Sequence, residues 1–118
     1  FGALYPLTQL YQLDADRSRG DSTLAVRMGV QRALAFSILQ VGVAFAIFAA
    51  AGWLSHWPTV PGLRWSALAI ALLAWMAVLA PWHRDGSGWA SRDHQRAMYH
   101  ALVAWALTDV AILLAWVA

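Results

Sequence analysis

Residues 33–54 read ALAFSILQVGVAFAIFAAAGWL and contain no charged side chain. At 1.5 Å per residue, a helix over this stretch crosses the roughly 30 Å hydrocarbon core of a bilayer. Residues 65–82 are also uncharged, and residues 97–118 carry His100 and Asp109 within a mostly apolar run. The sequence therefore predicts an all-α integral membrane protein with three transmembrane helices, at about 33–54, 65–82 and 97–118.

The composition agrees with a membrane location and argues against several classes of function. Of 118 residues, 61% are hydrophobic and 12% are charged, which is about half the charged fraction of a soluble domain. The chain has no cysteine, so disulfides and thiolate metal sites are excluded. Its arginines are scattered through the connecting segments, and we expect no nucleic-acid binding. Catalytic triads, metal-enzyme motifs and phosphate-binding glycine loops are absent, so the protein is expected not to be catalytic by itself.

Residues 1–32 form the polar N-terminal part of a chain that we expect to be one membrane domain, residues 1–118. This segment is predicted to lie at the membrane interface and in the cytoplasm. Its apolar start, FGALYPLTQLYQL, has a second interpretation as the tail of a further membrane helix. The sequence does not separate these two possibilities and does not identify what precedes Phe1.

The distribution of arginine predicts the orientation of the chain. Residues 1–32 and the loop at residues 83–96 hold every arginine except Arg64. Under the positive-inside rule, both segments are expected to be cytoplasmic, and the first connection and the C-terminus are expected to face outward. The expected location is the bacterial cytoplasmic membrane.

Asp109 is the main candidate for a functional side chain, because it lies near the bilayer centre in the third predicted helix. A charged group there costs roughly 2.5 kcal/mol or more. No basic residue lies at membrane depth in this chain. The partner of Asp109 is therefore expected to be a neutral donor, namely Gln40 or the indole N–H of Trp75 or Trp105, or to come from another subunit or a ligand. Two roles remain open, a hydrogen-bonded contact between helices and a proton or cation site.

His100 is a candidate ligand of a haem b group, although an interfacial histidine is the simpler interpretation. It lies on the opposite face of its helix from Asp109. The length and three-helix layout are similar to those of the membrane-anchor subunits of succinate dehydrogenase and fumarate reductase, which often supply haem or quinone ligands. In those anchors an Asp-Tyr pair follows the histidine, whereas Val110 follows Asp109 here. We therefore assign no family and no metal site.

The first predicted helix has a stripe of small residues, Gly42, Ala46 and Ala50, that favours close packing of another helix. Gln40 lies on roughly the opposite side of this helix. A helix contacted on both sides needs neighbours beyond three spans, so the partners are expected to be other membrane subunits or copies of the chain. The predicted function is a structural subunit of a membrane complex. The alternatives are a redox anchor for haem or quinone, and a homo-oligomeric transporter or channel that uses Asp109.

Overall fold

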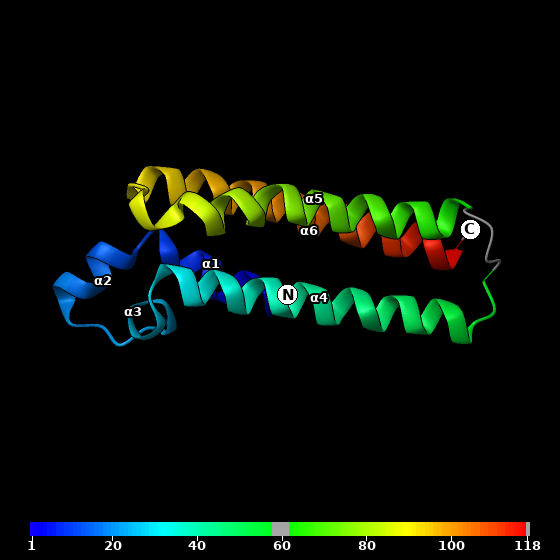
Figure 1. Ribbon diagram of the computed structural model, residues 1–118, viewed down its shortest axis with the longest axis horizontal. Helices are drawn as coiled ribbons and strands as arrows, with labels where there is room; N and C mark the ends of the chain where they lie inside the picture. The colour runs from blue at the N-terminus through cyan, green and yellow to red at the C-terminus, as the bar shows by residue number, and fades with distance from the viewer. Residues whose placement is uncertain (58–61, 118) are drawn as a thin grey trace.

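Three long helices run side by side along the molecule (Figure 1). The computed structural model describes residues 1–57 and 62–117, and this part of the chain contains helices and no strand. The long helices are α4 (Val30–Leu54), α5 (Leu63–Asp85) and α6 (Ser91–Val117). Each is long and apolar enough to cross a membrane, which confirms the predicted fold class.

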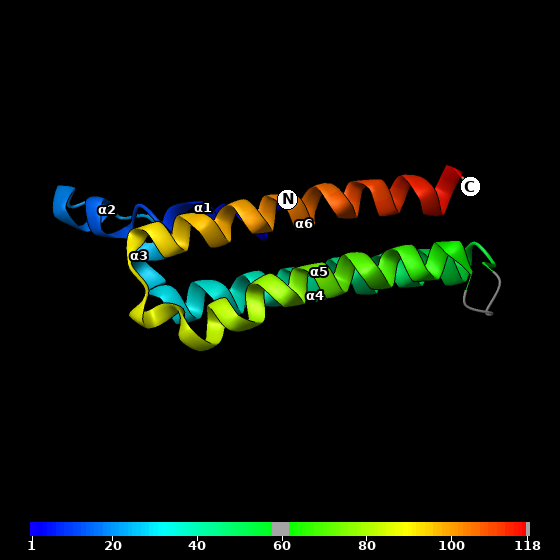
Figure 2. The ribbon, with the colours of Figure 1, turned by 90° about the horizontal axis from the view of Figure 1, so that it is seen from above.

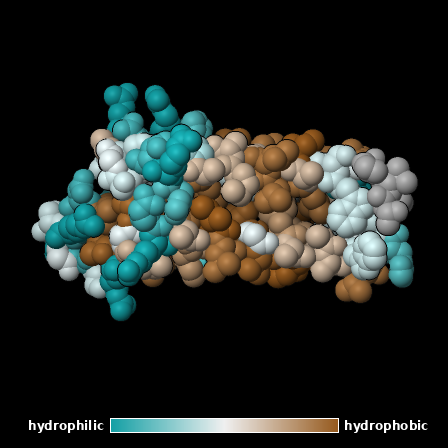
Figure 3. Space-filling view, viewed as in Figure 1, coloured by the Kyte–Doolittle hydropathy of each residue, from teal (hydrophilic) through white to brown (hydrophobic). Residues whose placement is uncertain are grey.

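The surface follows the pattern expected of a membrane protein. Hydrophobic residues cover the middle of the molecule, and hydrophilic residues gather at one end (Figure 3). That end contains the short helices α2 (Leu13–Arg19) and α3 (Leu24–Met28) with the adjoining ends of the long helices. We call it the arginine-rich end, and the opposite end, which carries Trp57, Trp65 and Trp116, the tryptophan end.

The helices occupy the corners of a square. In Figure 1 α4 lies below α5, and in the perpendicular view of Figure 2 α6 lies beside α5, so α4 and α6 stand at diagonal corners. The short helix α1 (Leu4–Leu10) lies against both α4 and α6 and occupies the fourth corner at the arginine-rich end. It buries Leu4, Pro6, Leu7 and Leu10. Ser37 Oγ of α4 donates a hydrogen bond of 2.9 Å to the Ala3 carbonyl at its start. The apolar N-terminal stretch is thus part of the bundle core.

Among the helix pairs of the described chain, α5 and α6 pack against each other most extensively. The face of α6 that lies against α5 consists of small side chains. At spacings of three and four residues these side chains form one stripe along the helix, and small residues let two helix backbones approach closely. The buried members are Ala97, Ala101, Ala104, Thr108, Ala111 and Ala115.

Helix α5 continues past Pro81 to Asp85, beyond the predicted end at residue 82. Proline removes one backbone hydrogen bond and crowds the preceding turn. The residues that follow are held by tertiary contacts, because Trp82 is completely buried and its Nε1 donates a hydrogen bond of 2.8 Å to His94 Nδ1 on α6. The Trp89 ring stacks on the Trp82 ring, with 6.3 Å between the two ring centroids. These contacts stabilise the turn between the two helices.

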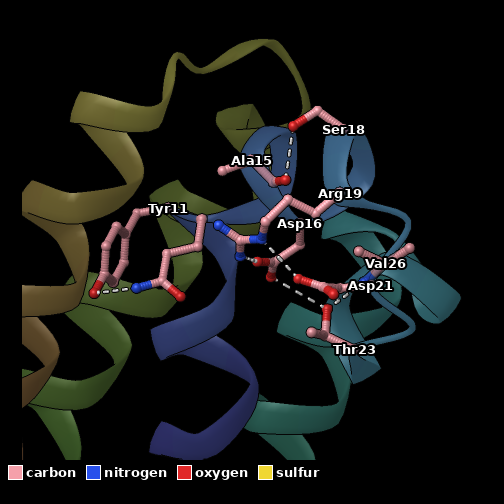
Figure 4. A network of polar contacts seen from close by, with 9 residues as sticks. Tyr11, Ala15, Asp16, Ser18, Arg19, Asp21, Thr23 and Val26 are labelled. Carbon is pink, nitrogen blue, oxygen red and sulfur yellow. Dashed lines mark hydrogen bonds and ion pairs between the residues drawn. The ribbon is translucent and has the colours of Figure 1, made fainter.

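A polar network joins α2 to α3 at the arginine-rich end (Figure 4). The buried Asp16 carboxylate accepts a hydrogen bond of 2.6 Å from Arg19, and Arg19 also pairs with Asp21 at 2.9 Å. The hydrogen bond that Arg19 donates to Asp21 is the main reason that the pKa of Arg19 is raised. Thr23 caps α3 by accepting a hydrogen bond from the Val26 N–H. Gly20, at φ +74°, makes the turn that ends α2.

The tryptophan end is closed by packing around the Trp57 ring. Its centroid is 5.2 Å from the ring centroid of Trp65 and 4.6 Å from that of Trp116. The guanidinium carbon of Arg64 lies over the ring, 5.6 Å from its centroid. Gly52 of α4 lies directly under Trp57, where an added Cβ would come within 2.7 Å of the ring. The close approach of ring and backbone therefore requires glycine at position 52.

Gly52→Ala should lower the free energy of unfolding in detergent by about 1–2 kcal/mol, because overpacking against a fixed ring exceeds the gain in helix propensity. Gly88→Ala is the control, since a Cβ there meets nothing within 4 Å. It should change the free energy of unfolding by no more than about 0.5 kcal/mol. Equal effects of the two substitutions would show that Trp57 does not pack on α4 in this way.

Candidate functional site

An open groove lies between α4 and α6 at the level where α1 begins. It is a cavity of about 450 Å³, a volume within the range of small-molecule sites. We call it the α4–α6 groove. Its walls are mainly aliphatic and aromatic side chains, and its polar members are Gln40, Thr108 and Asp109. Two of the residues predicted to lie deep in the membrane, Trp75 and Trp105, also line it.

The beginning of α1 closes the groove toward the arginine-rich end. The Phe1 ring meets the edge of Trp105 with 6.2 Å between ring centroids. The side-chain amide of Gln40 packs directly over the backbone of Gly2, where a Cβ atom would collide with Gln40 Oε1. The groove therefore has a floor near the middle of the spans and extends from there toward the tryptophan end.

The indole of Trp75 is not available to Asp109. Its Nε1 donates a hydrogen bond of 2.9 Å to Thr108 Oγ1, and the Thr108 hydroxyl donates one of 2.8 Å to the Ala104 carbonyl. Trp75 and Thr108 are both buried. Sequence reasoning missed Thr108, although its position in line with the alanines of the buried α6 stripe was a usable signal.

Asp109 lies on the wall of the groove and is exposed. It makes no hydrogen bond or ion pair with the residues that the structure describes, and the same holds for the amide of Gln40. No arginine or histidine lines the groove within the described ranges. The structure thus brings Gln40, Trp75, Trp105 and Asp109 to one groove, where the carboxyl group has no partner among the described residues.

His100 lies elsewhere, in a second hollow at the arginine-rich end. Trp89, Asp93, Arg96 and Ala97 line this hollow with it. Asp93 is seven residues before His100, on the same stripe of α6. Within residues 1–57 and 62–117, no three or more side chains of the usual metal-binding types gather into a site. His100 therefore lies apart from Asp109 and the α4–α6 groove.

The small-residue stripe of α4 lies on the exposed surface of the described residues. Gly42, Ala46 and Ala50 are all exposed, and nothing lies within 4 Å of a Cβ built at Gly42. The stripe faces away from the core residues Val41 and Phe45 on the same helix. Any close helix contact at this stripe must come from outside the described chain.

Comparison of the chain with protein-family models, curated proteins and solved structures finds no match. The interpretation of the groove and of the exposed stripe therefore depends on their own geometry.

Thr108→Val should lower the free energy of unfolding by about 1 kcal/mol, the usual size of an interhelical polar contact in a membrane. Valine has nearly the shape of threonine but cannot accept the hydrogen bond from Trp75. Thr108→Ser keeps the hydroxyl and should retain more of the stability. Unfolding in mixed micelles, measured for both variants, tests this contact, and a Val variant as stable as the parent would contradict it.

Proposed function

We propose that the chain is a small integral membrane subunit that packs within a larger membrane protein complex. The observation that carries this proposal is the unexplained Gly42 in the middle of the exposed face of α4. Glycine in a helix interior costs about 1 kcal/mol relative to alanine. The chain's own fold gives no reason for that cost at position 42, because a Cβ there would meet nothing within 4 Å.

Two other glycines, Gly52 and Gly86, support this argument by contrast. A Cβ at Gly52 would strike the ring of Trp57, and one at Gly86 would come within 2.7 Å of Trp82. At each of these positions a neighbouring side chain explains why glycine is needed. At Gly42 the missing neighbour is best supplied by a helix of another subunit or of another copy, which approaches over Ala46 and Ala50.

Replacing Ala46 with leucine should weaken this assembly, because the longer side chain keeps the neighbouring helix at a distance. Ala69→Leu is the matched control, since Ala69 is an exposed alanine of α5 outside the stripe. The particle mass in a mild detergent should fall for Ala46→Leu and stay unchanged for Ala69→Leu, with both variants still inserted. A parent chain that is monomeric under these conditions, or an Ala46→Leu variant that assembles normally, would remove the support for this role.

The proposal includes an orientation in a bacterial cytoplasmic membrane. The arginine-rich end, with the loop at residues 83–96, is placed in the cytoplasm, and the C-terminus is placed outside. A periplasmically active reporter such as alkaline phosphatase should be active after Ala118 and inactive when inserted after Gly88. The reverse pattern would contradict the proposed orientation while leaving the helix contact untested.

A further inference from the structure

The hollow on α6 at the arginine-rich end brings groups of both charges together in a volume of about 420 Å³. Its lining side chains are Trp89, Asp93, Arg96, Ala97 and His100. We call it the α6 hollow. None of these residues lines the α4–α6 groove, and His100 lies on the opposite face of α6 from Asp109. The α6 hollow is therefore a separate site.

The charged and polar side chains of the α6 hollow are not satisfied by one another. Arg96 and His100 are exposed and make no hydrogen bond or ion pair with the described residues. Asp93 accepts a hydrogen bond of 3.3 Å from the Ala90 N–H through Oδ2, and its Oδ1 accepts none from the described chain. Asp93 and Arg96 are three residues apart on one helix, about 5–6 Å between Cβ atoms. An occupant of the hollow therefore meets one negative and one positive group side by side.

The Trp89 ring is a wall of the hollow that the turn between α5 and α6 holds in place. It stacks on the completely buried Trp82, and its centroid is 5.9 Å from that of His94. Trp82 and His94 are joined by a hydrogen bond of 2.8 Å. A ring held in this way loses little freedom when a ligand binds, and its face attracts an ammonium group.

The α6 hollow lies at the level expected for lipid headgroups. Arg96 is the last arginine of the chain, and His100 lies about one helical turn further into the apolar part of α6. Beyond His100, the same face of the helix carries the exposed side chains of Val103 and Leu107. A lipid whose polar group occupies the hollow would lay its acyl chain along these two side chains. This continuity favours a lipid over a small solute.

We propose that the α6 hollow binds the headgroup of a phospholipid with a primary ammonium group, of the phosphatidylethanolamine type. Arg96 and His100 donate hydrogen bonds to the phosphate, and the ammonium group lies between the Asp93 carboxylate and the Trp89 ring. Two carbon atoms join the phosphate to the ammonium in this lipid, so its two charges match the close spacing of Asp93 and Arg96. The site is on α6, so the inference does not depend on the proposed role of the α4 stripe in assembly.

Native mass spectrometry of the purified chain in a non-ionic detergent measures how tightly single lipids bind. Phosphatidylethanolamine should occupy one site per chain, at least about fivefold more tightly than phosphatidylcholine or phosphatidylglycerol with the same acyl chains. The methyl groups of choline prevent hydrogen bonds to Asp93, and phosphatidylglycerol has no positive charge. Inorganic phosphate in excess should not displace the lipid, because it makes no contact with Val103 and Leu107.

Two substitutions separate the phosphate contact from the ammonium contact. Arg96→Gln should weaken binding of both phosphatidylethanolamine and phosphatidylglycerol about tenfold, because a charge-assisted hydrogen bond to the phosphate is lost. Asp93→Asn keeps an acceptor for the Ala90 N–H. It should weaken binding of phosphatidylethanolamine alone.

Arg92→Gln is the matched control for Arg96→Gln. Arg92 is an exposed arginine of α6 that does not line the hollow, so its replacement should leave lipid binding unchanged. Circular dichroism and thermal melting of each variant identify any loss of fold.

Three results would overturn the inference. The first is equal affinity of the folded parent chain for the three lipids. The second is an Arg92→Gln variant that loses as much binding as Arg96→Gln, which would show only a general attraction of lipid to this end of the molecule. The third is displacement of the lipid by inorganic phosphate, which would make the hollow a site for a soluble anion.

Discussion

The separation of α4 and α6 determines where a groove lies in the described part of this protein. The two helices pack on different sides of α5, and α1 lies between them at the arginine-rich end. Near Gln40 and Trp105 the start of α1 lies against both helices. The described residues beyond it line a groove of about 450 Å³ between α4 and α6, and Asp109 is exposed on its wall. A charged group at this depth of a bilayer is costly unless it is paired.

Much of the fold could be predicted because spans depend on local properties, namely length, hydropathy and the absence of charge. The position of α1 in the bundle could not be predicted from the sequence. A helix of seven residues has too few turns for a decisive periodicity, and its burial depends on two helices that are distant in the sequence. The end of α5 was also beyond local reasoning, since the contact between Trp82 and His94 carries the helix past Pro81.

The candidate site shows the same limit. Gln40, Trp75 and Trp105 were equivalent as neutral donors for Asp109 until packing directed the Trp75 indole to Thr108. Two stripes of small residues are also alike in composition, yet the one on α6 is buried against α5 and the one containing Gly42 is exposed. A stripe of small residues shows that another helix can pack closely on that face. Only the folded bundle shows whether that helix belongs to the same chain.

Disulfide trapping tests this arrangement most directly, because the chain has no cysteine of its own. Ala3→Cys combined with Ser37→Cys places two thiols where the Ser37 hydroxyl meets the Ala3 carbonyl at 2.9 Å. Ala44→Cys combined with Asp109→Cys places them on opposite walls of the α4–α6 groove. With a mild oxidant in a bilayer, the first pair should cross-link readily within one chain and the second should stay reduced. Ready cross-linking of the second pair, or none of the first, would contradict the separation of α4 and α6.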